Sequence, residues 1–139
     1  MFIKQDDVVD LVIYYREVGR KDYEAFTSDE FSTDVEEKEK DKFNQLKVSM
    51  RRMNWGTYNS IQDQATEEDA LTGKRNFNYI KYKESRLKAA LASWDAKDAE
   101  GKEVPITEEN IKSLSPDIAE AILRAYDSDS FVDEDEEKN

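Results

Sequence analysis

The sequence contains no cysteine and no histidine among its 139 residues. Disulfide bonds and thiol chemistry are therefore excluded. The lack of histidine removes the side chain that most often transfers protons near neutral pH. Zinc would have to rely on carboxylates alone, which suit it poorly. No segment matches a phosphate-binding loop or a dinucleotide-binding turn. We therefore expect a protein that is not an enzyme and that has no metal site and no cofactor.

Long apolar runs are also missing. No run approaches the roughly 18 residues of a membrane-spanning helix. The first residues, MFIKQDD, lack the charged start and apolar core of a signal peptide. We expect a soluble, intracellular protein with no membrane partner.

The charge is strongly acidic and unevenly distributed. The 33 acidic and 21 basic residues give a net charge of −12, which on average repels nucleic acids and anionic membranes. Residues 127–139 contain seven acids and one lysine, whereas residues 42–88 contain ten basic and five acidic residues. Basic proteins, or apolar segments held by a surface patch, are the expected partners.

The length predicts one domain with a modest core, because only 37% of the residues are apolar. We expect a mainly α fold, a small helical domain with a short β element near residues 45–53 and a disordered acidic C-terminal tail. The expected organisation is an N-terminal helical segment at 1–26, a charged linker at 27–42, a helical body at 43–127 and the tail at 128–139.

Three segments before residue 54 differ in their pattern of apolar residues. Residues 6–18 carry apolar side chains at helical spacing, which favours a helix, although their β-branched residues leave a strand open: Val8, Leu11, Val12, Tyr15 and Val18. Residues 27–42 are a charged linker or an exposed helix. Leu46, Val48 and Met50 alternate with polar residues, which predicts a strand.

Helix signals follow in order. Asn54 is expected to cap a helix over about 54–65, and Gly73 to form the pivot of a turn. The longest helix is expected from about 78 to 94, with Ile80, Leu87, Leu91 and Trp94 on one face. Gly101 can take a positive φ in the loop that follows.

The stretch PITEENIKSLSPDIAEAI contains two helix starts. Thr107 is an N-cap flanked by a hydrophobic staple of Ile106 and Ile111, and Ser115 is an N-cap followed by Pro116. We expect one shared core containing Trp94, Ile106, Ile111, Leu114, Ile118 and Ile122.

The segment KRNFNYIKYKESRLK (residues 74–88) interleaves six basic residues with three aromatics. This pattern can bind single-stranded nucleic acid, but the acidic charge of the chain favours a helix with a basic outer face and no nucleic-acid partner. A third interpretation is that the acidic tail folds back on this segment and masks it. Two acidic stretches, DAEGKEVPITEE and DSDSFVDEDEE, fail the calcium-loop pattern.

Several side chains are candidates for partner binding. Trp55, in the first turn of a helix, is either a core residue or a half-exposed docking anchor. Met50 and Met53 flank Arg51 and Arg52, which form either an adaptable contact surface or ordinary packing with surface arginines.

Three stretches together resemble the tail assembly chaperones of tailed bacteriophages: LKVSMRRMNWGTYNSIQDQAT, TGKRNFNYIKYKESRLKAALASWD and DAEGKEVPITEENIKSLSPDIAEAILRAYD. The resemblance covers roughly residues 46–127 and rests on the order and spacing of these motifs. It implies a small, mostly helical, non-virion protein of the host cytoplasm. Such a protein binds the tape-measure protein and keeps it soluble until tail-tube subunits polymerise around it.

Helix-in-groove binding suits this role. We expect a groove between the helix at 79–94 and the last helix. The candidate partner-binding residues are Trp55, Tyr58, Tyr82, Leu87, Trp94, Tyr126, Arg51 and Arg52. Contacts with the tail-tube protein and homo-oligomers also fit this role. Two other readings remain open: a structural virion component of the neck or tail, and an acidic DNA mimic, which the placement of half the net charge in the tail disfavours.

Overall fold

The computed structural model describes the backbone of residues 1–138 and the side chains of residues 1–129. The helices are α1 (Ser28–Asp34), α2 (Trp55–Gln64), α3 (Tyr79–Ala90), α4 (Glu108–Lys112) and α5 (Pro116–Lys138), with a 3-10 helix, η1, at Glu37–Lys42. The strands are β1 (Val8–Glu17), β2 (Tyr23–Thr27), β3 (Asn44–Arg51), β4 (Thr66–Glu68), β5 (Arg75–Phe77) and β6 (Leu91–Trp94).

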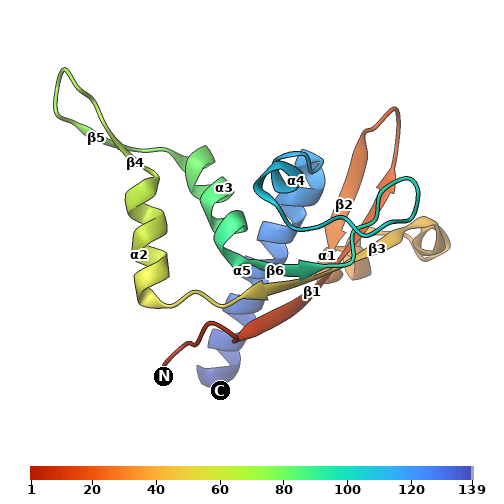
Figure 1. The fold of residues 1–139 in the computed structure, drawn as a ribbon. Coiled ribbons are helices and arrows are strands. Elements are labelled where there is room, and N and C mark those ends of the chain that lie inside the picture. The colour runs from red at the N-terminus through yellow and green to blue at the C-terminus, as the bar shows by residue number, and fades with distance from the viewer. Residues whose placement is uncertain (139) are drawn as a thin grey trace.

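A four-stranded antiparallel sheet with the strand order β2-β1-β3-β6 forms the centre of the fold (Figure 1). A separate two-stranded hairpin joins β4 to β5. The expected mainly α fold is therefore wrong, and the architecture is mixed α and β. The β element expected near 45–53 is present as β3, which lies inside the larger sheet between β1 and β6.

The N-terminal segment forms a strand where we favoured a helix. Val9, Leu11 and Ile13 alternate toward the core along β1, and β1 pairs with β2 on one side and β3 on the other. Every residue of β1 is paired with at least one of these strands, and residues 13–15 are paired with both. The β-branched residues that left a strand open fit this pleated, half-buried position.

Helix α5 contacts β1 and β2 and closes the main core. Ile13, Val48 and Met50 of the sheet and Ile122 of α5 are the largest side chains that are fully buried. On the sheet's other side, Tyr14 stacks on Phe31 of α1 with ring centroids 3.9 Å apart, and Phe43 lies edge-on to Phe31. The charged segment at 27–42 is thus helical in two short pieces, neither of which contains a buried residue.

Two further corrections concern the C-terminal half. The helix expected to reach Trp94 ends at Ala90, and Leu91–Trp94 continue as β6, because pairing with β3 outweighs the helical spacing of Leu91 and Trp94. The acidic segment expected to be disordered continues α5 through Lys138, because the helix is already anchored by its buried N-terminal half. Asn139 lies outside the described residues.

The predicted turns at Gly73 and Gly101 and the caps at Asn54 and Thr107 are confirmed, whereas a side-chain cap at Ser115 stays a prediction. Asn54 and Thr107 each accept a hydrogen bond from the backbone N–H three residues later, and α5 begins at Pro116. Gly73 and Gly101 have φ values of 70° and 81°. The expected shared core is also confirmed: Ile111, Ile118 and Ile122 are buried, and Trp94, Ile106 and Leu114 pack against the same cluster.

Candidate binding surface

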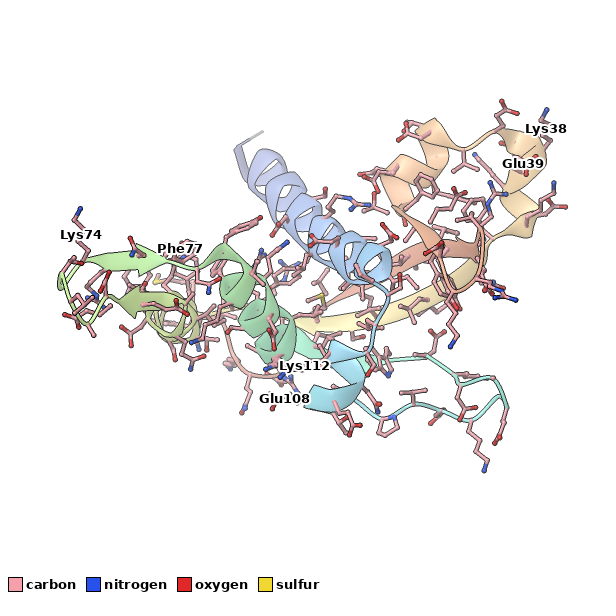
Figure 2. All side chains as sticks on the ribbon, turned by 90° about the horizontal axis from the view of Figure 1, so that it is seen from above. Lys38, Glu39, Lys74, Phe77, Glu108 and Lys112 are labelled. Carbon is pink, nitrogen blue, oxygen red and sulfur yellow. The ribbon has the colours of Figure 1, made fainter. Side chains whose placement is uncertain are left out.

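The residues between β3 and β6 form a projection that we call the arm (residues 54–90: α2, β4, β5 and α3). The arm extends to one side of the sheet, with the β4–β5 hairpin at its far end (Figure 1). Seen from above, Lys74 and Phe77 of the arm lie at the opposite end of the molecule from Lys38 and Glu39 (Figure 2). The arm exposes six large apolar side chains: Trp55, Tyr58, Leu71, Phe77, Tyr79 and Ile80.

Trp55 and Tyr58 form the first aromatic pair of the arm. The side chain of Asn54 accepts a hydrogen bond from the N–H of Thr57 at 2.9 Å and so starts α2 at Trp55. The two rings lie three positions apart in this helix and stack with centroids 6.3 Å apart and planes 19° apart. Trp55 is 77% exposed and Tyr58 is 44% exposed. The pair therefore offers a flat apolar surface to solvent at low cost in side-chain entropy.

A second aromatic cluster lies where the hairpin meets α3. Tyr82 lies 5.2 Å from Phe77 and 6.3 Å from Tyr79, measured between ring centroids. Asn78 links the two elements: its side chain caps α3 by accepting from the N–H of Lys81, and its backbone N–H donates to the carbonyl of Ala65 at 2.7 Å. Phe77 and Tyr79 remain about half exposed or more.

A groove of about 640 Å³ runs between α2 and α3. Its walls are mainly small or polar: Gly56, Thr57, Ser60, Ile61, Gln64, Lys81, Glu84, Ser85, Lys88 and Ala89. We expected a groove between α3 and the last helix. Lys83 and Arg86 of α3 form ion pairs with Glu120 and Asp127 of α5, and a groove between these two helices stays a prediction.

Three of the predicted binding residues lie in or against the core. Leu87 is 4% exposed and Tyr126 is 7% exposed. The Tyr126 hydroxyl donates to the carbonyl of Arg51 at 2.8 Å, and burial raises the pKa of this tyrosine. Trp94 is half-buried, and its Nε1 donates to the carbonyl of Val104 at 2.6 Å. These contacts give the three residues a structural role, and a binding role for them stays a prediction.

Arg51 and Arg52 connect elements that are distant in sequence. Arg51 Nη1 donates to the carbonyl of Leu91 at 2.9 Å, and Arg52 Nη2 lies 3.2 Å from Oδ2 of Asp129. Both side chains are only partly exposed. Trp55 and Tyr58 are therefore the only two of the eight predicted residues that are classed as exposed within residues 1–129.

The basic residues of the 74–88 segment are largely engaged by acids. Lys83 contacts Glu120 at 2.6 Å, Lys88 contacts Glu108 at 2.9 Å, and Arg86 pairs with Asp127. Burial acts to lower the pKa of Arg86, but its hydrogen bond and attraction to Asp127 raise it overall. Phosphate groups would have to compete with these carboxylates. Asp127 lies on α5 before the expected tail, and α5 continues as one helix through Lys138, so folding of the tail onto this segment stays a prediction.

Sequence reasoning missed Phe77, Tyr79 and Ile80 as exposed residues. We placed Ile80 on the buried face of a long helix, yet it is 74% exposed. Its helical spacing with Leu87 holds, but α3 reaches the core only through its second half, at Leu87 and Ala90. The polar neighbours Asn76, Asn78 and Lys81 were the available signal that this end of the helix leaves the body.

Among the described residues, no group of three or more acidic side chains is arranged to hold a metal ion. Within residues 1–138, no helix is both long enough and apolar enough to cross a membrane. Comparisons with protein families, with characterised proteins and with solved structures found no match for this chain.

Proposed function

We propose that this chain is a tail assembly chaperone of a tailed bacteriophage, which binds the tape-measure protein in the host cytoplasm and keeps it soluble. The motif resemblance over residues 46–127 is the basis of this proposal. The observation that supports it best is the exposed Trp55–Tyr58 pair on α2, since exposed aromatic anchors are the side chains that most often dominate protein binding.

The distribution of charge suits a holdase. The arm, which contains the exposed apolar groups, has six basic and five acidic residues, whereas the remainder of the chain has 15 basic and 28 acidic residues. An apolar helical segment can therefore contact the arm without strong charge repulsion. We call the remainder of the chain, residues 1–53 and 91–139, the body. The acidic body would stay in solvent and keep the complex soluble through its net charge.

Co-expression with the tape-measure protein encoded beside it tests the proposal. We expect the tape-measure protein to become soluble and to co-purify with the chain. Because the proposed contact is apolar, co-purification should persist at 0.5 M NaCl, whereas a contact made by surface ion pairs would weaken. Trp55→Ala with Tyr58→Ala should reduce co-purification. An insoluble tape-measure protein with nothing bound would contradict the proposal.

The second candidate function is that of a structural component of the neck or tail. Analysis of purified phage particles distinguishes it from the chaperone function. A chaperone is absent from finished particles, and a structural component is present in a fixed number of copies. Mass spectrometry of purified particles therefore distinguishes the two, and it also tests whether a contact with the tail-tube protein outlasts assembly.

A further inference from the structure

We infer that two copies of this chain associate through their arms, related by a two-fold axis, and that this contact covers the exposed aromatic side chains when no other partner is bound. This inference goes beyond the proposed function and does not depend on it. Three features of the arm carry it: its exposed apolar side chains, its shortage of packing partners and its charge.

The first feature is how much large apolar surface the arm exposes. Trp55, Leu71 and Ile80 are each at least 74% exposed, and Tyr58, Phe77 and Tyr79 are between 44% and 61% exposed. On residues 1–129 outside the arm, the exposed large apolar side chains are Val18 and four near the N-terminus: Met1, Phe2, Ile3 and Val8. Among these side chains Trp55 stacks on Tyr58, and Phe77 and Tyr79 both lie beside Tyr82. Clusters of exposed apolar groups mark an interaction surface more often than isolated residues do.

The second feature is that the outer part of the arm, α2 and the β4–β5 hairpin, packs mainly on α3 and on itself. Helix α2 packs on α3 and β4, and its one buried residue is Ile61. The β4–β5 hairpin has three residue pairs, and all three residues of β5 are exposed. A two-stranded hairpin is only marginally stable in water, and it gains stability when a further layer covers it. A second arm can provide that layer.

The third feature selects the second arm as the occupant. The arm is nearly neutral, with six basic and five acidic residues, whereas the rest of the chain has an excess of 13 acids. Any contact that brings the bodies of two copies together is opposed by electrostatic repulsion between their negative charges. A contact between two arms is not opposed in this way, and its paired charges, such as Arg75 with Asp63, can exchange partners across the axis.

A contact between one arm and the body of another copy is less favourable, even though their charges differ. It would place the aromatic groups of the arm against charged surface, because the described body offers few exposed apolar side chains to meet them. Such a head-to-tail contact also has no reason to close and would generate open chains of molecules. The two-fold arrangement buries apolar surface on both sides and stops at two copies.

Sedimentation equilibrium of the full chain, over protein concentrations from micromolar to hundreds of micromolar, tests the inference. We expect a monomer–dimer equilibrium that strengthens at 0.5 M NaCl, since salt screens repulsion between the bodies without weakening apolar contact. Two double variants, Trp55→Ala with Tyr58→Ala and Tyr79→Ala with Ile80→Ala, should each weaken dimerisation at least tenfold. Alanine is a good helix former, so α2 and α3 should persist in both.

The matched control is Val8→Ala with Val18→Ala, which removes exposed apolar groups from the body and should leave the dimer unchanged. Circular dichroism of each variant verifies that the fold is kept. A chain that is monomeric at every concentration overturns the inference. So does a dimer that only the control variant weakens, or growth beyond two copies. None of these outcomes bears on binding of the tape-measure protein, which is measured separately.

Discussion

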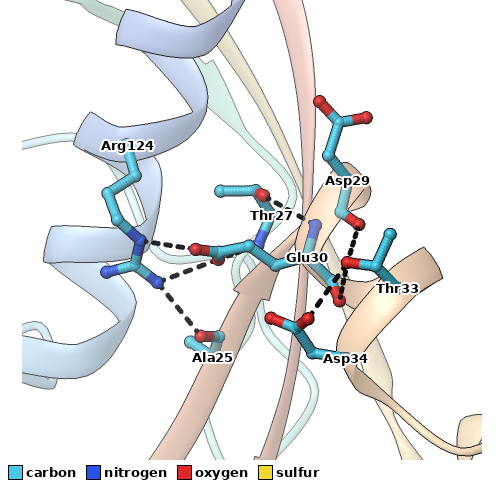
Figure 3. Close-up of polar contacts among 7 residues, drawn as sticks. All are labelled: Ala25, Thr27, Asp29, Glu30, Thr33, Asp34 and Arg124. Carbon is cyan, nitrogen blue, oxygen red and sulfur yellow. Dashed lines mark hydrogen bonds and ion pairs between the residues drawn. The ribbon is translucent and has the colours of Figure 1, made fainter.

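Arg124 of α5 binds Glu30 of α1 across 94 residues of sequence, with Nε 3.0 Å from Oε2 and Nη2 3.1 Å from Oε1 (Figure 3). The same Nη2 donates to the carbonyl of Ala25 in the edge strand β2 at 3.3 Å. Glu30 also completes the cap of α1, because its Oε1 accepts from the N–H of Thr27 while the Thr27 hydroxyl accepts from the N–H of Glu30. One carboxylate thus links the last helix to the start of the first.

Replacement of Glu30 by alanine should lower the free energy of unfolding by about 1–2 kcal/mol, measured by urea denaturation at pH 7. The substitution removes half of the capping box and a partly exposed ion pair, and each contributes on the order of 1 kcal/mol or less. Glu37→Ala is the control, since that side chain is 91% exposed and pairs only along η1. A loss at Glu30 no larger than that at Glu37 would show that the link contributes nothing.

The pair also predicts a pH dependence. Burial alone would raise the pKa of Glu30, but hydrogen bonds from Arg124 and Thr27 lower it below its ordinary value of 4.5. A carboxylate with a lowered pKa stabilises the fold above pH 4.5, and this contribution is lost as the pH falls through the folded-state pKa. Glu30→Gln retains the capping geometry and removes the charge.

The difference in free energy of unfolding between the natural chain and Glu30→Gln should therefore be largest near pH 7 and should shrink below pH 4.5. Other carboxylates whose pKa is lowered, such as Glu84 beside Lys88, remain in both proteins and cancel in the comparison. Urea titrations at several pH values between 3 and 7 measure the difference. A gap that is constant over this range would contradict the assigned role of the Glu30 charge.

Features set by neighbouring residues were predictable from the sequence. The caps at Asn54 and Thr107 and the positive φ at Gly73 and Gly101 depend on local backbone chemistry that a few residues specify. The shared core around Ile122 was also predictable, because Ile111, Ile118 and Ile122 lie in two helices, α4 and α5, whose starts are marked in the sequence.

Features that depend on pairing between strands distant in the sequence were not predictable from the sequence. Residues 8–17 fit both periodicities, and the choice depended on β2 and β3, which the local pattern does not identify. In the same way, Leu91 and Trp94 keep helical spacing with Leu87 but pair with β3. Exposure was left open at Trp55 and missed at Ile80, since periodicity does not tell which end of a helix leaves the body.

Replacement by alanine should have opposite effects on stability at Gly101 and at Gly56, because the two residues differ in backbone conformation. Gly101 has a φ of 81°, so alanine there should cost about 1–2 kcal/mol although no atom lies within 4 Å of the added methyl group. Gly56 lies in the first turn of α2, and an added methyl group would meet only Asn54 Oδ1 at 3.6 Å. Alanine there should stabilise the protein by up to about 1 kcal/mol. Thermal unfolding of both variants should show shifts of opposite sign, and shifts of the same sign would contradict this assignment.

The arm should open more readily than the sheet. Helix α2 is tied to the arm by Ile61 and Ala65, whereas β1 and β3 share the main core. Segments with few buried contacts open locally at low free-energy cost. Hydrogen exchange followed by mass spectrometry should show faster exchange of backbone amides in α2 and the β4–β5 hairpin than in β1 and β3.

Ile61→Ala sharpens this prediction. Loss of a buried isoleucine typically costs about 2–5 kcal/mol, but here the cost falls on the arm. Exchange should therefore accelerate in α2 and the hairpin and remain slow in β1 and β3. Val48→Ala, which removes methyl groups from the main core, is the matched comparison and should accelerate exchange throughout the sheet and α5. Equal acceleration of arm and sheet in Ile61→Ala would mean that the arm and body unfold as one unit. In that case the arm could not release or rearrange its aromatic surface without unfolding the chain.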